Sequence, residues 1–305
     1  MIGPQVHMLP DGRRLHLNHG PIDLIVEAFG AAGEVKAAYQ QATSRFQTIL
    51  PELAEELPAL RRAASSRPRR FAGVTALRME AAVSPLAAEN FITPMAAVAG
   101  SVADEILATM LEGRALDRAY VNNGGDSALF LAPGQSMRLA IAGAGHGFAD
   151  RIVIRGEDAV RGVATSGWRG RSFSLGIADA VTVLARTGAE ADAAATIIAN
   201  AVDLPGHRAI RRERANVLAP DSDLGERLVT VEVGGLSAGE VAAALDAGLT
   251  VAGRLRTSGL IEDAVLFLKS ESRLCGAAFG DGEELRRVRR KPLHKLENIR
   301  EETHA

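Results

Sequence analysis

Residues Val181–Ala201 read VTVLARTGAEADAAATIIANA, a run of β-branched residues that passes directly into a run of small residues. β-Branched residues favour strands and alanine favours helices, so this stretch predicts a strand followed at once by a helix. Asp192 and Thr196 are four residues apart, and their side chains therefore project from the same face of that helix. A carboxylate beside a hydroxyl offers the oxygen ligands that Mg²⁺ prefers. Because the surrounding alanines leave space for a bulky ligand, we expect the functional site here.

The composition is typical of a folded protein that combines helices with strands. The chain has 305 residues, of which 47% are hydrophobic and 4% aromatic, and it contains 31 glycines. This length predicts one large domain or two closely joined halves. We expect a single domain over residues 1–305; the alternative division is into residues 1–115 with 190–305 and residues 116–189.

Charge and cysteine content exclude several classes of protein. The net charge of −2 gives no overall reason to bind nucleic acid or an anionic membrane. Cys275 is the single cysteine, which excludes an intramolecular disulfide framework and a multi-cysteine metal cluster. We find neither the apolar core of a signal peptide nor an apolar run of 18 residues, and we therefore expect a cytoplasmic protein. A homodimer is compatible with this composition, although no segment marks an interface.

The N-terminal part predicts strands and then a helix. Residues 13–30 alternate in polarity around a Gly-Pro pair, which predicts two strands joined by a turn. Residues 34–62 have helical spacing that is interrupted by Pro51 and Pro58. Since proline disrupts a helix interior, we expect one helix followed by a shorter one.

The central part predicts a long helix and then a strand meander. Thr93 and Pro94 provide a cap and a first-turn proline for a helix that ends near residue 112. Several short segments separated by glycine, aspartate and proline then predict antiparallel strands. These segments are residues 119–123, 128–131, 137–141, 151–154 and 162–165.

The C-terminal part adds another strand, helix and strand. We expect strands at residues 227–233 and 262–268, with a helix between them that begins after Ser237 and has Glu240 completing a capping box. Residues 285–305 are highly charged and predict a flexible, exposed tail. This mixed order of strands and long helices indicates an α+β fold rather than a doubly wound parallel sheet.

Two polar loops are candidates for ligand contacts. In the first, Gly124 and Gly125 can adopt positive φ and bring N–H groups close to a ligand, while Asp126 can accept a hydrogen bond. An ordinary hairpin turn is the alternative for this loop. The second loop follows a strand and supplies hydroxyl and guanidinium groups suited to a phosphate or diphosphate; a polar surface loop is its alternative. Its candidate residues are Thr165, Ser166, Gly167, Arg169 and Arg171.

Other motifs give no support for common catalytic classes. Residues 143–147 read GAGHG, but this spacing and the lack of a following helix favour a flexible hairpin over a dinucleotide loop. No nucleophile elbow or P-loop motif is present, and Cys275 has no identifiable base. The sequence therefore singles out no catalytic nucleophile or base.

The order of three motifs resembles a known family, the ApbE-type flavin transferases. The motifs are NNGGD (122–126), ATSG (164–167) and VTVLARTGAEADAAAT (181–196), and the similarity covers about residues 94–202. The segment PMAAVAGSVADEIL is similar to that family's glycine- and alanine-rich helix, with Asp104 at an aspartate position. The whole chain resembles still more closely an uncharacterised subfamily grouped beside ApbE.

This resemblance implies an ApbE-like fold, related to the T-fold, with two sheet–helix halves and a cleft between them. It also implies Mg²⁺-dependent cleavage of FAD, with the FMN half passed to a Thr or Ser hydroxyl of an acceptor flavoprotein, or hydrolysis of FAD to FMN and AMP. On this basis Asp192 and Thr196 would bind Mg²⁺. The flavin or adenosine side would be lined by Gly124, Gly125 and Asp126, and the diphosphate side by Thr165, Ser166 and Gly167.

The chain also departs from the family pattern. Ala99 stands where the family has a lysine, and the family's HIIDPRTG segment is missing. One interpretation is that Arg169 and Arg171 supply the charge, with Asp179 replacing the lost aspartate. The other is a catalytically inactive protein that binds a flavin or nucleotide, or assists maturation. A hydrolase of another phosphorylated metabolite is a third alternative.

Overall fold

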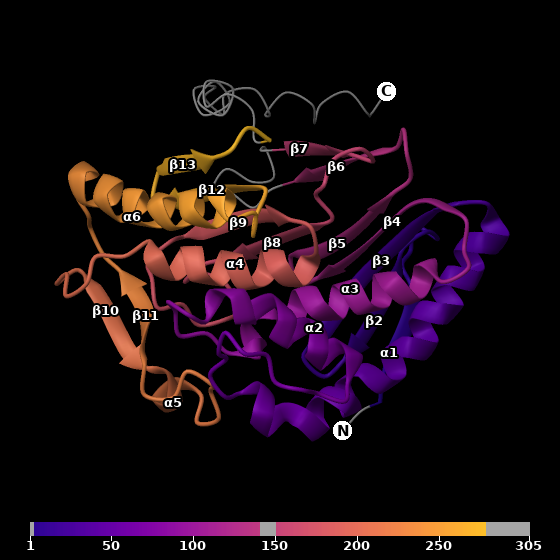
Figure 1. Cartoon of the computed structure of the whole chain (residues 1–305), viewed down its shortest axis with the longest axis horizontal. Coiled ribbons are helices and arrows are strands. Elements are labelled where there is room, and N and C mark those ends of the chain that lie inside the picture. Colours follow the sequence, from indigo (N-terminus) through magenta and orange to yellow (C-terminus); the bar gives the residue numbers. More distant parts are fainter. Residues whose placement is uncertain (1–2, 141–150, 279–305) are drawn as a thin grey trace, which may run out of the picture.

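The structure is a computed structural model that describes residues 3–140 and 151–278. Its main element is a nine-stranded sheet in the order β1-β2-β3-β4-β5-β8-β9-β12-β13, and every neighbouring pair is antiparallel (Figure 1). The strands are β1 (Gln5–Met8), β2 (Leu15–His19), β3 (Ile22–Gly30), β4 (Leu116–Asn123), β5 (Asp126–Leu131), β8 (Gly162–Ser166), β9 (Ala180–Ala185), β12 (Asp263–Leu268) and β13 (Glu271–Cys275). Two separate pairs are β6 (Ser136–Ala140) with β7 (Arg151–Arg155), and β10 (Ile210–Arg214) with β11 (Leu228–Val233).

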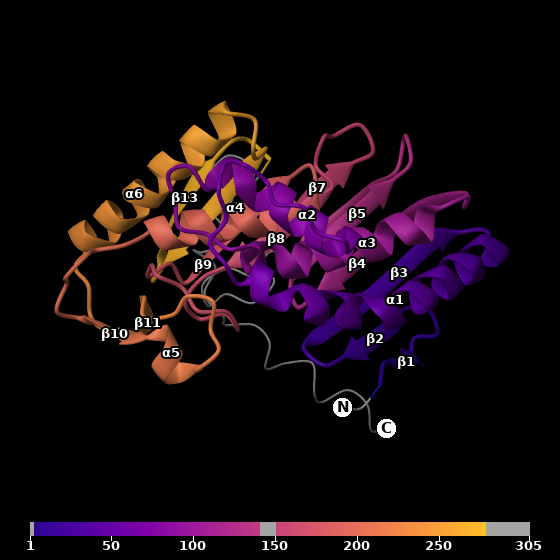
Figure 2. The same ribbon diagram turned by 60° about the horizontal axis from the view of Figure 1, so that its bottom comes forward.

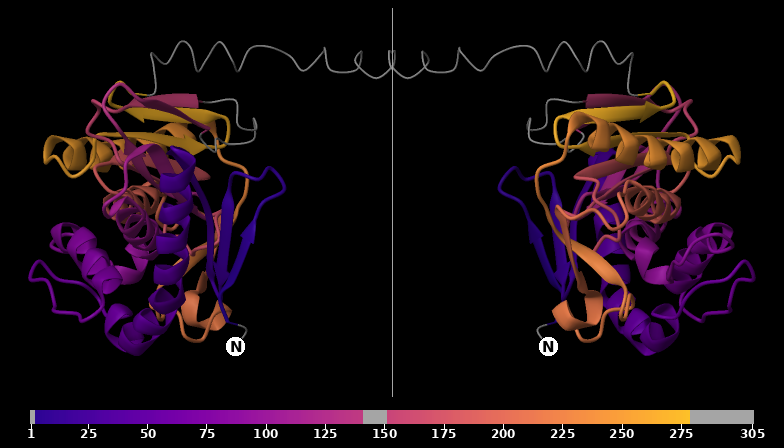
Figure 3. Two further views of the ribbon diagram at one scale, coloured as in Figure 1. Left: turned by 90° about the vertical axis from the view of Figure 1, so that its right-hand side faces the viewer. Right: turned by 90° about the vertical axis from the view of Figure 1, so that its left-hand side faces the viewer.

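Helices cover one face of this sheet. The helical elements are α1 (Ala32–Leu60), α2 (Val74–Val83), η1 (Ser84–Leu86), η2 (Pro94–Ala97), α3 (Val98–Leu111), α4 (Gly188–Ala201), α5 (Ala215–Leu218) and α6 (Ala238–Thr257). Figures 1 and 2 show α1, α3, α4 and α6 side by side along the sheet. In Figure 3 the strands at the two ends of the sheet run in clearly different directions. This difference is the accumulated twist expected of a large sheet.

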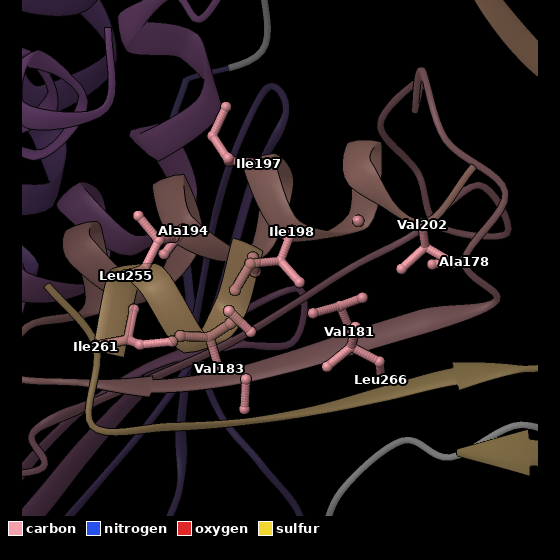
Figure 4. Packing of buried hydrophobic residues seen from close by; sticks show 14 of the residues in the cluster. Ala178, Val181, Val183, Ala194, Ile197, Ile198, Val202, Leu255, Ile261 and Leu266 are labelled. Atoms are coloured by element: carbon pink, nitrogen blue, oxygen red, sulfur yellow. The ribbon is translucent and has the colours of Figure 1, made fainter. Parts of the chain in front are cut away.

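Strand β9 is buried along its whole length because both of its faces are covered. Val181 and Val183 belong to the cluster formed with α4 and α6, and Figure 4 shows them beneath Ile198 of α4. Ala180 and Leu184 point the other way and join the cluster beneath β6 and β7. Alternate residues of a strand face opposite sides, so two apolar surroundings explain the continuous apolar run.

The predicted transition from strand to helix is confirmed. Helix α4 begins three residues after β9 ends, and Thr187 is its N-cap. The hydroxyl oxygen of Thr187 accepts a hydrogen bond from the Glu190 N–H (3.1 Å), which satisfies one of the free donors at the helix start. The predicted capping box of α6 is also confirmed, because Ser237 and Glu240 each accept from the backbone of the other.

The predicted break in the first helix is wrong. Helix α1 continues through Pro51 and Pro58 to residue 60. Its buried face continues through the same region, since Phe46, Leu53 and Leu60 lie in one core cluster with β2 and β3. Tertiary packing of this face outweighs the hydrogen bonds that the two prolines remove, at a cost of about 3 kcal/mol each.

Other predictions have mixed outcomes. The strands expected between residues 13 and 30, between 119 and 165 and in the C-terminal part are confirmed within the described ranges. The helix expected from Pro94 begins instead with the 3₁₀ turn η2, and Thr93 does not cap it through its side chain. Strands β1, β10 and β13 and helix α2 were not predicted. The GAGHG segment and the charged tail lie outside the described residues, and the division into halves stays a prediction.

One helical segment is long and apolar, although no apolar run of 18 residues was expected from the sequence. Residues Pro94–Leu111 have a mean hydropathy of 1.3 over 18 residues, which is enough by length and composition alone to cross a membrane. However, 61% of this window is buried inside the protein. The segment contains Asp104 and Glu105, and it packs in the core cluster against α1 and β4. Burial of this kind is typical of a core helix.

Helices α3 and α4 touch backbone to backbone at two glycines. A Cβ atom on Gly100 would lie 2.7 Å from the Ala189 nitrogen and still closer to the Gly188 carbonyl. Asp104 of α3 accepts hydrogen bonds from the N–H groups of Gly188 and Ala189, both at 2.8 Å. A side chain of one helix therefore satisfies the free N-terminal donors of the other.

The Gly100→Ala substitution should test this close approach. The added methyl group forces the two helices apart, so we expect the free energy of unfolding to fall by about 1–3 kcal/mol in urea or thermal unfolding. Gly253→Ala is a matched control, because its methyl group meets nothing within 4 Å in α6. That control should be neutral or more stable by about 1 kcal/mol. Equal stability of Gly100→Ala and wild type would contradict the contact.

Asp104→Ala should remove the cap that α3 provides for α4. Two backbone N–H groups lose their acceptor, so we expect a loss of about 1–3 kcal/mol in the free energy of unfolding. Asp104→Asn keeps one acceptor oxygen, and its loss should be smaller. Urea unfolding of the three proteins would measure both effects, and a larger loss for asparagine than for alanine would argue against a capping role.

Candidate functional site

A cavity of about 390 Å³ lies where α3, α4 and the turn after β4 meet. Several residues that the motifs single out line it together: Gly124, Asp126, Thr165, Ser166, Gly167, Arg171, Asp192 and Thr196. Another part of the wall is formed by Met95 and Ala96 of η2 and by Val98 and Ala99 at the start of α3. Hollows of about 800 and 640 Å³ along α1 are larger, but neither contains a residue from these motifs.

Asp192 stands in the second turn of α4, opposite the start of α3. Its Oδ2 accepts a hydrogen bond from the Gly100 N–H at 3.0 Å. Asp192 of α4 therefore caps the start of α3, just as Asp104 of α3 caps the start of α4. Burial, and then the charge of Asp126, raise the pKa of Asp192 well above its usual value, while the Gly100 N–H lowers it. Burial is thus the main reason for the raised pKa of Asp192, and the neighbouring carboxylate of Asp126 adds to it.

Asp126 joins the two polar loops. Its Oδ1 accepts a hydrogen bond from the Thr165 N–H at 3.0 Å, which connects the turn after β4 to the end of β8. Burial raises the pKa of Asp126 to about 6, against the opposing effects of the Thr165 N–H and the charge of Arg171. The Thr165 hydroxyl forms a hydrogen bond with the Thr182 hydroxyl of β9 at 2.8 Å. The loops are thus fixed to the central strands of the sheet.

The glycine pair has the backbone conformation that the sequence suggested. The φ angles of Gly124 and Gly125 are 64° and 122°, which are accessible mainly to glycine. A Cβ on Gly124 would lie 2.8 Å from Cζ of Arg171, so the missing side chain makes room for this guanidinium. Gly124 and Arg171 both line the cavity, whereas Gly125 is not among its lining residues.

Arg169 points to a different partner from Arg171. Its Nε lies 2.7 Å from Oδ1 of Asp179, which also accepts from Nε1 of Trp168 at 3.1 Å. The other oxygen of Asp179 accepts from the Lys269 N–H at 2.6 Å. Neither Arg169 nor Asp179 lines the cavity. Arg169 and Asp179 therefore brace the loop after β8 against the turn after β12, and Arg171 alone of the two arginines reaches the cavity wall.

The structure adds lining residues that the motifs do not contain. Phe173 follows the second loop, and Ser222, Asp223 and Leu224 come from the segment between α5 and β11. That segment lies about 20 residues beyond the end of α4 and reads as an ordinary polar turn, APDSDLG. The pair of aspartates in it was the only sequence signal, and such pairs are common in turns.

The donors in the cavity suit a hard cation. Asp126 and Asp192 are two interacting, partly desolvated carboxylates, and Thr196 adds a hydroxyl one turn along α4. Burial is the first cause of the raised pKa of both groups, and a divalent cation would stabilise their charged forms in this poorly solvated place. Within residues 3–140 and 151–278, no group of three or more His, Cys, Asp or Glu side chains could hold a metal ion. Mg²⁺ fits such a small set, because it commonly binds one or two carboxylates together with ligand phosphates.

Related proteins match about two fifths of the chain. A UPF0280 protein of Methanothrix thermoacetophila is 41% identical over 113 residues, covering 36% of this chain and 46% of its own length. Another, from Methanoregula boonei, is 35% identical over 128 residues, covering 41% of this chain and 52% of its own length. The chain therefore spans about half the length of the curated relatives it matches.

The fold and the family follow from two further matches. The flavin transferase ApbE from Vibrio cholerae superposes with a TM-score of 0.50 at 12% identity, over 90% of this chain and 99% of that one. This similarity confirms the predicted ApbE-like α+β fold. A family model described as AbpE bacteria matches residues 6–274. The chain therefore belongs to the AbpE bacteria family and has the fold of the ApbE flavin transferases.

Proposed function

We propose that this protein is a cytoplasmic, Mg²⁺-dependent enzyme that cleaves FAD. It either transfers FMN to a hydroxyl of an acceptor flavoprotein or hydrolyses FAD to FMN and AMP. One observation carries the proposal: a single cavity gathers Asp192, Thr196, Asp126 and Arg171 with the Thr-Ser-Gly strand end. A homodimer, and the lack of nucleic-acid and membrane partners, remain part of the proposal.

The cavity residues divide into charged and apolar groups that suit the parts of such a ligand. Asp126, Asp192 and Thr196 would hold Mg²⁺, which when bound neutralises charge on the diphosphate oxygens. Arg171 adds a fixed positive charge and up to five N–H donors for the same oxygens. The Ser166 hydroxyl is a further donor on this wall.

The remaining wall is apolar and suits a flat ring. It is formed by Met95, Val98, Phe173 and Leu224. Apolar side chains with a few placed polar groups are typical of sites for cofactors. An isoalloxazine or adenine ring would exclude water from this wall, while the phosphates face the carboxylates and Arg171.

A second candidate is a protein that binds flavin or another nucleotide without turnover. Ala99 lines the cavity at the position where ApbE-type enzymes have a lysine, and no histidine is among the lining residues in the described part of the chain. The loss of these groups favours binding alone. Equilibrium binding together with product analysis separates the two candidates, since only the enzyme produces FMN and AMP.

Asp192→Asn should abolish FAD cleavage. Asparagine can still accept the Gly100 N–H, so the helix contact is retained while the negative charge is lost. We expect the rate of FMN and AMP formation with Mg²⁺ to fall by about 100-fold or more, measured by chromatography.

Asp246→Asn is the matched control for this experiment. Asp246 pairs with Arg273 on the exposed surface of α6, outside the cavity. Its activity should equal that of the wild type. Unchanged activity of Asp192→Asn would remove Asp192 from the site, and an inert wild type across metals and acceptors would refute the enzyme.

Native mass spectrometry of the purified protein should detect a bound flavin or adenine nucleotide. The expected adduct has the mass of FAD, FMN or AMP, because the cavity combines an apolar wall with a cation site. Asp192→Asn should retain less of the adduct if the metal helps to hold the phosphates. A bound molecule that lacks a phosphate would contradict the assignment of the charged wall.

A further inference from the structure

Residues 209–234 form an arm that stands apart from the main sheet. It contains β10, α5 and β11, and Figures 1 and 2 show it beyond the ends of α4 and α6. The turn between α5 and β11 reaches back to the cavity, where Ser222, Asp223 and Leu224 line the wall. The arm therefore supplies a carboxylate to a cavity that is otherwise built by the sheet and its helices.

The arm is held at its base and at its tip. At the base, Arg212 forms an ion pair with Asp203, and the Thr230 N–H donates to the Ser174 carbonyl at 2.9 Å. At the tip, Arg61 lies 2.7 Å from the carboxylate of Asp221, whose side chain is 73% exposed. An exposed pair of this kind contributes about 0–1 kcal/mol, so the position of the tip depends also on its other contacts.

The most buried of the tip contacts joins Asp223 to Thr93. The Thr93 hydroxyl donates a hydrogen bond to Oδ2 of Asp223, and Thr93 is only 2% exposed. Thr93 directly precedes η2, where a threonine hydroxyl ordinarily accepts from the helix backbone, yet it makes no such cap here. The Thr93 hydroxyl therefore binds Asp223 instead of the helix backbone, and it fixes the orientation of the Asp223 carboxylate.

Asp223 differs from the other two carboxylates of the cavity. Asp126 and Asp192 each accept a backbone N–H group, and the charge of Asp126 helps to raise the pKa of Asp192, which suits a cation held by both. Asp223 comes from the arm, and its Oδ2 is bonded to a hydroxyl. In the described part of the chain, no hydrogen bond to its Oδ1 occurs. One oxygen of Asp223 is therefore available to a ligand.

We propose that Asp223 is the general base of the reaction in this cavity, an assignment that rests on the proposed function. The attacking oxygen belongs to an acceptor hydroxyl or to water. It forms a bond to the FMN phosphorus and gives its proton to Oδ1 of Asp223. The bond from that phosphorus to the bridging oxygen breaks, and this oxygen leaves with its electron pair on AMP. Serine and threonine hydroxyls in the same cavity are too weakly basic for this task.

Steady-state cleavage of FAD with Mg²⁺ tests the assignment in the full-length protein. Asp223→Asn should lower kcat by about 100-fold or more while KM for FAD changes by less than about threefold, because general bases typically contribute factors of 10²–10⁴. Glu226→Gln is the matched control. It removes a carboxylate from the same arm, but Glu226 is exposed and does not line the cavity, so its kcat should equal that of the wild type.

Two further variants distinguish a general base from a residue that only holds the arm in place. Asp221→Asn weakens the tip contact with Arg61 without altering the cavity, and it should leave kcat within about threefold of the wild type. In Asp223→Ala, added formate should restore part of kcat by replacing the missing carboxylate. Equal losses in Asp221→Asn and Asp223→Asn, with no effect of formate, would show that Asp223 only closes the arm and would overturn the assignment.

The remaining outcomes distinguish the two levels of the proposal. A wild type that cleaves FAD and an Asp223→Asn variant that is equally active would refute the base alone. A wild type that binds FAD without forming FMN or AMP would refute the enzyme and, with it, the base. Normal FAD binding by Asp223→Asn, measured by titration, would show that the variant is folded and that its loss is in the chemical step.

Discussion

The site depends on helices α3 and α4, which touch at Gly100 and Gly188. Each of the two helices supplies a carboxylate that caps the start of the other. Asp104 of α3 satisfies the first N–H groups of α4, and Asp192 of α4 satisfies an N–H in the first turn of α3. The backbones can approach this closely only because neither glycine has a side chain. Both helix starts, with their partial positive charge, thereby lie beside each other, and the start of α3 lines the cavity through Val98 and Ala99.

This arrangement concentrates negative charge in a place that is poorly solvated. Burial raises the pKa values of Asp104 and Asp126 to about 6 and that of Asp192 further above its ordinary range. Among the cavity residues, Arg171 is the single side chain of opposite charge in the described part of the chain. A site with excess carboxylate and only oxygen donors is physically suited to a hard cation and, through it, to a phosphate.

How far the sequence predicts this structure depends on whether a signal is local. The step from β9 to α4 is local, because β-branched residues, the Thr187 cap and the alanine run all agree, and it is confirmed. The sequence cannot show whether Arg169 or Arg171 faces the cavity, because the two arginines lie in the same loop and have nearly the same neighbours in the sequence. Only the fold shows that Asp179 lies beside one of them. The same holds for Asp223, since its approach to the cavity depends on the path of an entire arm.

The position of β9 within the sheet has a further consequence. It lies between β8 and β12 in the interior of the nine-stranded sheet, and α4 rises directly from it. Amide protons in such a place exchange with solvent only through large openings of the molecule, whereas those at the tip of a peripheral arm exchange through small local ones. Asp192 and Asp223, which share one cavity, therefore belong to segments at opposite ends of the protein's range of local stability.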